Sequence, residues 1–290
     1  MAELKYKLTN DTLFKLLFVK YRDTLLKRLV AALLGIRVED IGADFRVTNS
    51  EMPPDMLGEK FCHLDINMTV NGQLVDLEVQ VEDEGDYPER SLYYWSREYS
   101  SALPVGSSDY SMLPRTIVVS ILAFPLFRCA EYHSEFGLLE VRRHERLTDR
   151  LAMHYFELPK LPAVADAEDE LKLWLAFFNA KTEEDLKNLM AIGGDIMVQA
   201  VEAYRSVSAS DELRELERQR DRTRRNEASA LANAERRGEQ RGEQRGEQRG
   251  ERRGESNKSL EIAKKMRADG ADVDTIAKWT GLTVDEVLKL

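Results

Sequence analysis

The residues with the clearest chemical potential are two carboxylates, Asp65 and Glu78, on either side of an Asn71-Gly72 pair. Asn-Gly between alternating apolar residues is a strong signal for a two-residue hairpin turn. Counting outward from this turn places Asp65 directly opposite Glu78, with their Cβ atoms about 4.5–5.5 Å apart. Like charges so placed repel each other, and a divalent cation between them would remove the repulsion. Oxygen-only ligation, completed by a backbone carbonyl near Val79, suits Mg²⁺ or Mn²⁺ better than zinc.

The same register divides the hairpin into two faces. The polar face carries Asp65, with Asn67 opposite Asp76 and His63 opposite Gln80. The alternative interpretation is a half-exposed hairpin whose polar face simply lies in water. That alternative explains the alternation but not the acid-on-acid pair. The apolar face consists of Leu64, Ile66, Met68, Val70, Val75, Leu77 and Val79.

The order of predicted elements is that of an α/β core over residues 8–127. Helical spacing of apolar residues predicts a long first helix that begins at Thr9 or Asn10 and ends at Gly35. A strand near residues 115–124 is apolar on both faces, which is typical of the interior of a covered sheet. The other predicted elements are a short strand in residues 43–52, the hairpin in residues 61–85, a helix in residues 90–104 and an extended edge strand in residues 150–162 that ends at prolines.

Beyond residue 160 the pattern becomes helical and then strongly charged. Three segments with helical apolar spacing in residues 167–206 predict a helical subdomain. The 290-residue chain is long enough for one large domain and an accessory part. We therefore expect an α/β core in residues 1–160, a helical subdomain in residues 161–210, a charged linker or helix in residues 211–257 and a small helical segment in residues 258–290.

The charged part carries a four-residue repeat, RGEQ, between Arg237 and Ser256. Four residues is close to the helical period, so identical side chains stack one turn apart, Arg above Arg and Glu above Glu. Each glycine costs about 1 kcal/mol against alanine in a helix, so such a helix is marginal alone. A solvated spacer of nearly balanced charge is preferred over a nucleic-acid-binding arm, although its arginines can contact phosphates non-specifically.

The last segment has the pattern of a small helical hairpin. One helix ends near Gly270, a second covers residues 273–281, and a third begins at Thr283, where Glu286 completes a capping box. This looks like the core of a helix-turn-helix. The recognition helix would be acidic with a single lysine, so direct reading of bases would be weak. Dimerisation or packing is an equally good interpretation of the segment.

Composition argues against several classes of protein. A net charge of −10 argues against a general nucleic-acid-binding surface, although it is also what metal-holding carboxylates would give. No apolar run approaches the roughly 18–20 residues of a membrane span, and the N-terminus lacks a signal-peptide pattern. Two cysteines, Cys62 and Cys129, match neither a disulfide framework nor a zinc site. We expect a cytoplasmic protein without a membrane partner.

Six segments, taken in order, carry a family resemblance. They are NDTLFKLLF near the start, HLDI at Asp65, LEVQ at Glu78 to Gln80, then YPERSLYYWSREY, SDYSMLPRTIVVSIL and finally IAKWTGLTVDEVLKL. With these segments the chain resembles the PD-(D/E)XK nuclease superfamily, and within it the recombination-promoting nuclease or transposase-like group. No single segment is specific, but the ordered set is, and it covers almost the whole chain.

The resemblance implies a restriction-endonuclease-like fold, which is a mixed central sheet flanked by helices. It also implies that the protein hydrolyses DNA phosphodiesters with Mg²⁺ or Mn²⁺. It makes Asp65 and Glu78 the metal ligands, and Gln80 takes the place usually held by a lysine. Glutamine can orient water or phosphate by hydrogen bonds but brings no positive charge against the developing negative one. This departure from the superfamily pattern puts an efficient turnover rate in doubt. Glutamine at this place is nevertheless typical of the group.

Two cations near the hairpin could supply the missing charge. Arg90, at the start of the predicted second helix, is the better candidate for a phosphate contact, and an ordinary solvated arginine is the alternative. Lys60 lies at the start of the strand that bears Asp65. Its register, however, puts the Lys60 side chain on the apolar face.

Three further residues are weaker candidates for the site. Asp11 and Lys15 are one helical turn apart, so they could form an ion pair or belong to the site, and the resemblance favours the site. His63, beside Gln80, could be a spare ligand or a base.

Two classes of function follow from these residues. The first is a metal-dependent DNA endonuclease linked to recombination or mobile elements. The second is a nuclease-fold protein for DNA binding or assembly with weak or no catalysis, which Gln80 and the acidic net charge favour somewhat. Both have DNA as the partner, and both allow a homo-oligomer, such as a dimer, through the C-terminal tail.

Overall fold

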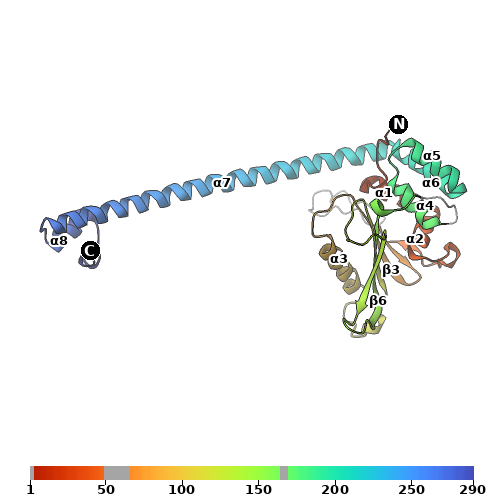
Figure 1. Ribbon diagram of the computed structural model, residues 1–290, viewed down its shortest axis with the longest axis horizontal. Helices are drawn as coiled ribbons and strands as arrows, with labels where there is room; N and C mark the ends of the chain where they lie inside the picture. The colour runs from red at the N-terminus through yellow and green to blue at the C-terminus, as the bar shows by residue number, and fades with distance from the viewer. Residues whose placement is uncertain (1–2, 49–65, 164–168) are drawn as a thin grey trace. The chain divides into compact units, whose positions relative to one another are not determined.

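The computed structural model describes residues 3–48, 66–163 and 169–290, the side chain of Glu227 excepted (Figure 1). The chain divides into two compact units, residues 1–221 and residues 222–290. Within the described ranges, none of the helices combines the length and apolar character that crossing a membrane requires.

The first unit is built on a mixed six-stranded sheet with the strand order β1-β2-β3-β4-β6-β5. The pairs β3-β4 and β4-β6 are parallel, and the other three pairs are antiparallel. This mixed sheet agrees with the expected fold class. The strands are β1 (Arg46–Val47), β2 (Ile66–Val70), β3 (Gln73–Gln80), β4 (Thr116–Leu122), β5 (His133–Leu139) and β6 (Arg146–Glu157).

The predicted hairpin register is confirmed over the described part of β2 and β3. Asn71 and Gly72 both have positive φ, 51° and 72°, as a type I′ turn requires. Asn67 pairs with Asp76, and the pairing is followed as far as Ile66 opposite Leu77. The side chain of Asp44 accepts hydrogen bonds from the backbone N–H groups of the turn, at 3.2 and 2.5 Å. This contact fixes the turn from outside the hairpin.

The predicted first helix is present but is interrupted at Tyr21. It consists of α1 (Asp11–Lys20), a π-helical turn η1 (Arg22–Leu26) and α2 (Lys27–Leu34). Asn10 caps its start by accepting from the backbone N–H of Leu13, and Gly35 ends it with a φ of 65°. The apolar spacing is helical on both sides of Tyr21, so it gives no sign of the extra residue in the π turn.

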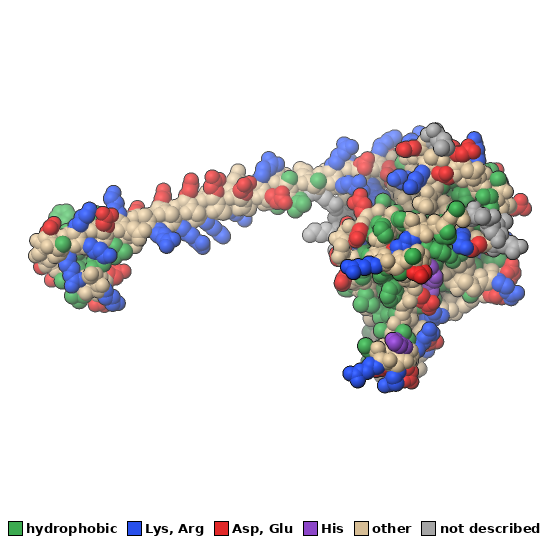
Figure 2. All heavy atoms as spheres, viewed as in Figure 1, with side chains coloured by type: hydrophobic (Ala, Val, Ile, Leu, Met, Phe, Trp, Pro, Cys, Tyr) green, Lys and Arg blue, Asp and Glu red, His purple; other side chains and the backbone are tan. Residues whose placement is uncertain are grey.

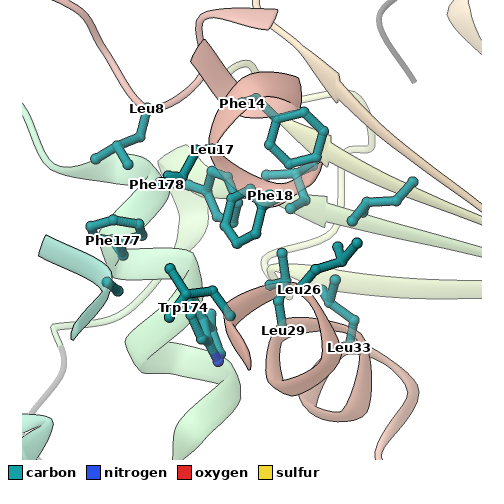
Figure 3. Packing of buried hydrophobic residues seen from close by; sticks show 14 of the residues in the cluster. Leu8, Phe14, Leu17, Phe18, Leu26, Leu29, Leu33, Trp174, Phe177 and Phe178 are labelled. Atoms are coloured by element: carbon teal, nitrogen blue, oxygen red, sulfur yellow. The ribbon is translucent and has the colours of Figure 1, made fainter. Parts of the chain in front are cut away.

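The apolar face of the sheet packs against α1, α2 and three later helices in one hydrophobic cluster. Figure 3 shows Phe14 and Phe18 of α1 against Trp174 and Phe178 of α4. The ring centroids of Phe18 and Phe178 lie 5.7 Å apart. The three predicted helices are confirmed as α4 (Glu170–Asn179), α5 (Glu183–Ile192) and α6 (Gly194–Ser208).

The opposite face of the sheet is covered by α3 (Tyr87–Ser101), whose residues contact β3 and β4. The helix begins three residues earlier than predicted, because Pro88 lies in its first turn, where a missing N–H removes no hydrogen bond. Trp95 donates from Nε1 to the backbone oxygen of Thr116 at 3.0 Å. A helix therefore covers the face of β3 that the sequence shows as polar.

Strand β6 was predicted to lie at the edge of the sheet. It lies instead between β4 and β5. The prediction was wrong because β5 supplies a second neighbour. That strand is hard to recognise because its residues, His133–Leu139, do not alternate between polar and apolar types. The prolines that suggested an edge follow the last strand residue, Glu157, and therefore interrupt no ladder. Short 3₁₀ turns complete this unit, at Val38–Asp40, Tyr110–Met112 and Leu158–Lys160.

The charged region forms part of one 58-residue helix, α7 (Asp211–Ala268), which contains the RGEQ repeats. Figure 2 shows arginines along one edge of this helix and glutamates along the opposite edge. Each repeat places Arg and Glu two residues apart, which is about 200° around a helix. The helix ends before Gly270, as predicted.

The three-helix pattern of the C-terminal segment is confirmed. The end of α7 is followed by α8 (Val273–Thr280) and α9 (Val284–Leu288). The capping box between Thr283 and Glu286 is formed in both directions. Ala263, Ile276 and Val287 make the small buried core of this segment.

Candidate active site

Strand β3 carries three polar side chains on the face that α3 covers: Asp76, Glu78 and Gln80. Their exposed fractions are 4%, 0% and 8%. The interpretation of this face as a solvent-exposed hairpin surface is therefore wrong. Polar groups buried in this way need specific partners or a functional reason.

The carboxylate of Glu78 is held by a tyrosine and a serine. Tyr87, in the first turn of α3, donates from its hydroxyl to Glu78 Oε2 at 2.7 Å, and its hydroxyl lies 2.8 Å from Oγ of Ser120. A phenol has one proton, so the Ser120 hydroxyl must donate to Tyr87 in this arrangement. Burial, and then the nearby Glu78 charge, raises the pKa of Tyr87 well above its usual range, so it remains a donor.

The other oxygen of this carboxylate is unpaired. Glu78 Oε1 is buried and has no hydrogen-bond partner among the described residues. The Gln80 amide lies at 3.5 Å from Oε2, at the limit of a hydrogen bond. An acceptor-only oxygen is thus left free in a dry part of the protein.

Arg90 completes the site at the end of β3. One guanidinium nitrogen donates to Gln80 Oε1 at 2.9 Å, and another is paired with Glu84. The guanidinium also lies over the ring of Tyr87, 5.2 Å from its centroid. The Arg90 side chain is only 13% exposed, so it is a fixed part of the site and not an ordinary solvated arginine.

Asp76 lies on the same face, two residues before Glu78. Burial, and then the charges of Glu78 and Glu98, raises the pKa of Asp76 well above its usual range. Its Oδ1 atom is buried and has no hydrogen-bond partner among the described residues. Opposite Asp76, Asn67 donates from Nδ2 to Glu98 at 3.1 Å. In the described ranges, no group of three or more His, Cys, Asp or Glu side chains is arranged to hold a metal ion.

Three of the candidate residues, Asp65, Lys60 and His63, lie outside the described residues. The described register ends with Ile66 opposite Leu77, one pair before the predicted acid pair. The pairing of Asp65 with Glu78 therefore stays a prediction.

Asp11 and Lys15 lie on α1, which packs with the apolar face of the sheet. Asp11 is bound by Arg220 of α7, with 2.5 Å between Oδ2 and a guanidinium nitrogen. Lys15 is buried, at 6% exposure. Of the candidates, the structure brings together Glu78, Gln80 and Arg90 on the opposite face.

Tyr87, Ser120 and Asp76 were not among the residues predicted for the site. Asp76 could have been found, because its alternation with Glu78 and Gln80 puts all three on one face of a strand. Tyr87 carries a weaker signal, which is the Pro88 that marks the true start of the helix. Ser120 carries none, since it is one of two polar residues in an otherwise apolar strand.

Comparisons with protein families match both parts of the chain. The family described as "PD-(D/E)XK nuclease family transposase" matches residues 8–234. The domain described as "Rpn/YhgA-like nuclease family, C-terminal HTH domain" matches residues 256–290. No curated protein and no solved structure matches the chain. Since the first match spans more than half of the 290 residues, the chain belongs to the PD-(D/E)XK nuclease family of transposases.

Proposed function

We propose that this protein is a DNA endonuclease that hydrolyses phosphodiester bonds with Mg²⁺, or Mn²⁺ in its place, in recombination or in the movement of mobile elements. Membership in a nuclease family of transposases supports the class of reaction, and PD-(D/E)XK nucleases typically use divalent metals. The observation that carries the proposal is the buried Glu78 carboxylate, which has one free oxygen beside Gln80 and Arg90.

The residues present suit a divalent cation. Glu78 offers an unpartnered acceptor oxygen that Tyr87 cannot satisfy from the other side of the carboxylate. Hard cations such as Mg²⁺ prefer carboxylate oxygens and often take only one or two from the protein. Glu78 would hold the ion, together with Asp65 as the sequence predicts. A bound divalent ion lowers the pKa of a water ligand and polarises a phosphate oxygen.

Gln80 and Arg90 act together in this proposal. The Arg90 guanidinium donates to the Gln80 oxygen, which turns the glutamine amide NH₂ toward Glu78. Arg90 thereby brings a positive charge to the place where lysine is usual, and its remaining donors can bind a phosphate oxygen. Tyr87 keeps Glu78 in position, and α3 excludes water from the row.

A second function has support in the same residues. Glu78 is completely buried, and glutamine stands where a charged lysine is usual. Both features favour a nuclease-fold protein that binds DNA or assembles on it with weak or no cleavage. The match of residues 256–290 to a C-terminal HTH domain supports DNA binding in either case. The α8–α9 segment carries more acids than cations, so we expect its binding to be only weakly sequence-specific.

A homo-oligomer through the C-terminal tail is part of the proposal. The repeats of α7 present arginines and glutamates on opposite edges, and a second copy carries the same charges at the same spacing. Sedimentation of the full chain at low and high salt tests this part, because pairing through exposed charges should weaken as salt rises.

The deciding experiment is cleavage of supercoiled DNA by the full chain with Mg²⁺ or Mn²⁺. Glu78→Ala and Asp65→Ala should reduce nicking to background. Glu157→Gln is the matched control, because Glu157 is also a buried acid on this sheet but is fully bonded to Leu126, Phe127 and Lys160. Cleavage that survives both alanine substitutions would rule out the site. DNA binding without cleavage under any metal would favour the second function.

A further inference from the structure

We propose that Asp76 is a further ligand of the divalent cation, so that the ion is held by an Asp-x-Glu pair on β3. This inference rests on the metal dependence proposed above and names a ligand that the family pattern does not require. It is carried by two unpartnered buried oxygens, Asp76 Oδ1 and Glu78 Oε1, on one face of one strand.

The geometry of a strand brings these carboxylates to the same side. Residues two apart on a β-strand point to the same face and are about 6.6 Å apart along it. On that face, the register places Asp76 level with Val118 of β4 and Glu78 level with Ser120. The valine can give Asp76 no hydrogen bond. A single cation can therefore be reached by both side chains from one strand.

The described residues around Asp76 add negative charge instead of neutralising its carboxylate. The negative charges of Glu98 on α3 and of Glu78 on β3 both repel a charged Asp76 carboxylate. Among the residues that the structure describes, Arg90 is the cation bonded to this row, and it is already paired with Gln80 and Glu84. Carboxylates buried together in this way are unfavourable unless a proton or a cation compensates them.

A second buried acid shows how this protein stabilises a structural carboxylate. Glu157 is 1% exposed, and it accepts from the backbone N–H groups of Leu126 and Phe127 at 2.5 and 3.0 Å. Lys160 adds an ion pair at 2.7 Å. Asp76 is buried almost as deeply on the same face of the sheet and leaves an oxygen unbonded. The contrast points to a partner for Asp76 other than the side chains that the structure describes, and a divalent cation is such a partner.

The test is metal binding by the full chain, measured by calorimetric titration with MgCl₂ and MnCl₂ in the absence of DNA. Asp76→Asn keeps the shape of the side chain and removes its charge, and Asp76→Ser is the second variant in case the first does not fold. Glu157→Gln is the control for removing a buried acid. Melting temperature in EDTA and in excess metal is the second readout.

We expect Asp76→Asn to weaken metal binding about tenfold or more, which is the size of effect that even outer partners of metal ligands have. The same variant should melt higher than wild type in EDTA and gain less from added metal. Glu157→Gln should melt lower and bind metal as wild type does. Metal affinity of Asp76→Asn within twofold of wild type would overturn the inference and would identify Asp76 as a protonated structural acid.

The outcomes also separate this inference from the proposed function. If wild type binds neither metal, the proposed metal dependence fails. If wild type and Asp76→Asn bind metal but Glu78→Gln does not, only the role of Asp76 fails. If neither variant binds metal as wild type does, both the proposed metal dependence and the role of Asp76 stand.

Discussion

Tyr87 on α3 donates a hydrogen bond of 2.7 Å to Glu78 on β3, and this contact joins the covering helix to the strand that carries the proposed metal ligand. Both side chains are completely buried, at 0% exposure. Because the bond lies away from water, its loss leaves a carboxylate oxygen that no solvent molecule can readily satisfy. The contact therefore bears on both stability and the geometry of the site.

Tyr87→Phe removes this hydrogen bond without changing the ring. We expect the free energy of unfolding to fall by about 1–3 kcal/mol, the usual cost of an unsatisfied buried partner. Metal affinity should fall by about 10–100-fold, because Glu78 loses the group that orients it. Chemical denaturation and calorimetric titration measure the two effects. Tyr155→Phe is the control, since its hydroxyl bonds to Ser91 and not to an acid; it should lose stability and keep its metal affinity.

Gln80→Lys introduces the residue that the superfamily usually has, but into a site where Arg90 lies 2.9 Å from the glutamine oxygen. We expect this single change to lower the free energy of unfolding, because a hydrogen bond to a charged group worth about 1.5–3 kcal/mol is lost and two cations are brought together. Combining it with Arg90→Gln should restore the melting temperature and keep the nicking rate. A single Gln80→Lys variant as stable as wild type would contradict the role given to Arg90.

The His133–His154 pair should make folding sensitive to acid. The rings are stacked with centroids 5.3 Å apart, and burial lowers the pKa of both, against the opposing effect of Glu135. A lowered folded-state pKa means that the unfolded chain binds protons first. Stability is thus fully present above about pH 6.5 and is lost as the pH falls below that value.

Urea denaturation of wild type and His154→Gln, at about pH 7.5 and about pH 5, measures this sensitivity. The variant should lose less stability between the two pH values than wild type does. His144→Asn is the control, because His144 lies exposed on the β5–β6 turn with a φ of 56°, which asparagine tolerates. Equal pH dependence in wild type and His154→Gln would exclude the histidine pair as its source.

Glycines of the RGEQ repeats should weaken α7. A Cβ atom added at Gly242, Gly246 or Gly250 would meet nothing within 4 Å. Alanine at these three positions should stabilise the helix by about 1 kcal/mol each, which circular dichroism during heating would register as a later loss of helix. Gly270→Ala is the matched contrast: the space is also open, but its φ of 84° is strained for alanine, so the same change should destabilise the segment.

The features that the sequence predicted well are those that depend on neighbouring residues. Asn71-Gly72 set the turn, and the turn set the register, because a two-residue loop allows only one pairing. Thr283 and Glu286 formed the expected capping box for the same reason, since both partners lie within one helical turn. The interruption at Tyr21 was not predicted, because the apolar spacing stays helical on both sides of it.

The sequence by itself determined the described part of the hairpin, its polar and apolar faces, the helices of residues 170–208, the small helices of the C-terminal segment and the family. Only the tertiary structure decided that the polar face is buried, because alternation along a strand is the same whether water or a helix covers it. It also decided that β6 is internal and that Tyr87 and Arg90 from α3 are bonded to Glu78 and Gln80 on β3. Such contacts join segments through packing, and no local pattern of residues records which helix packs over which strand.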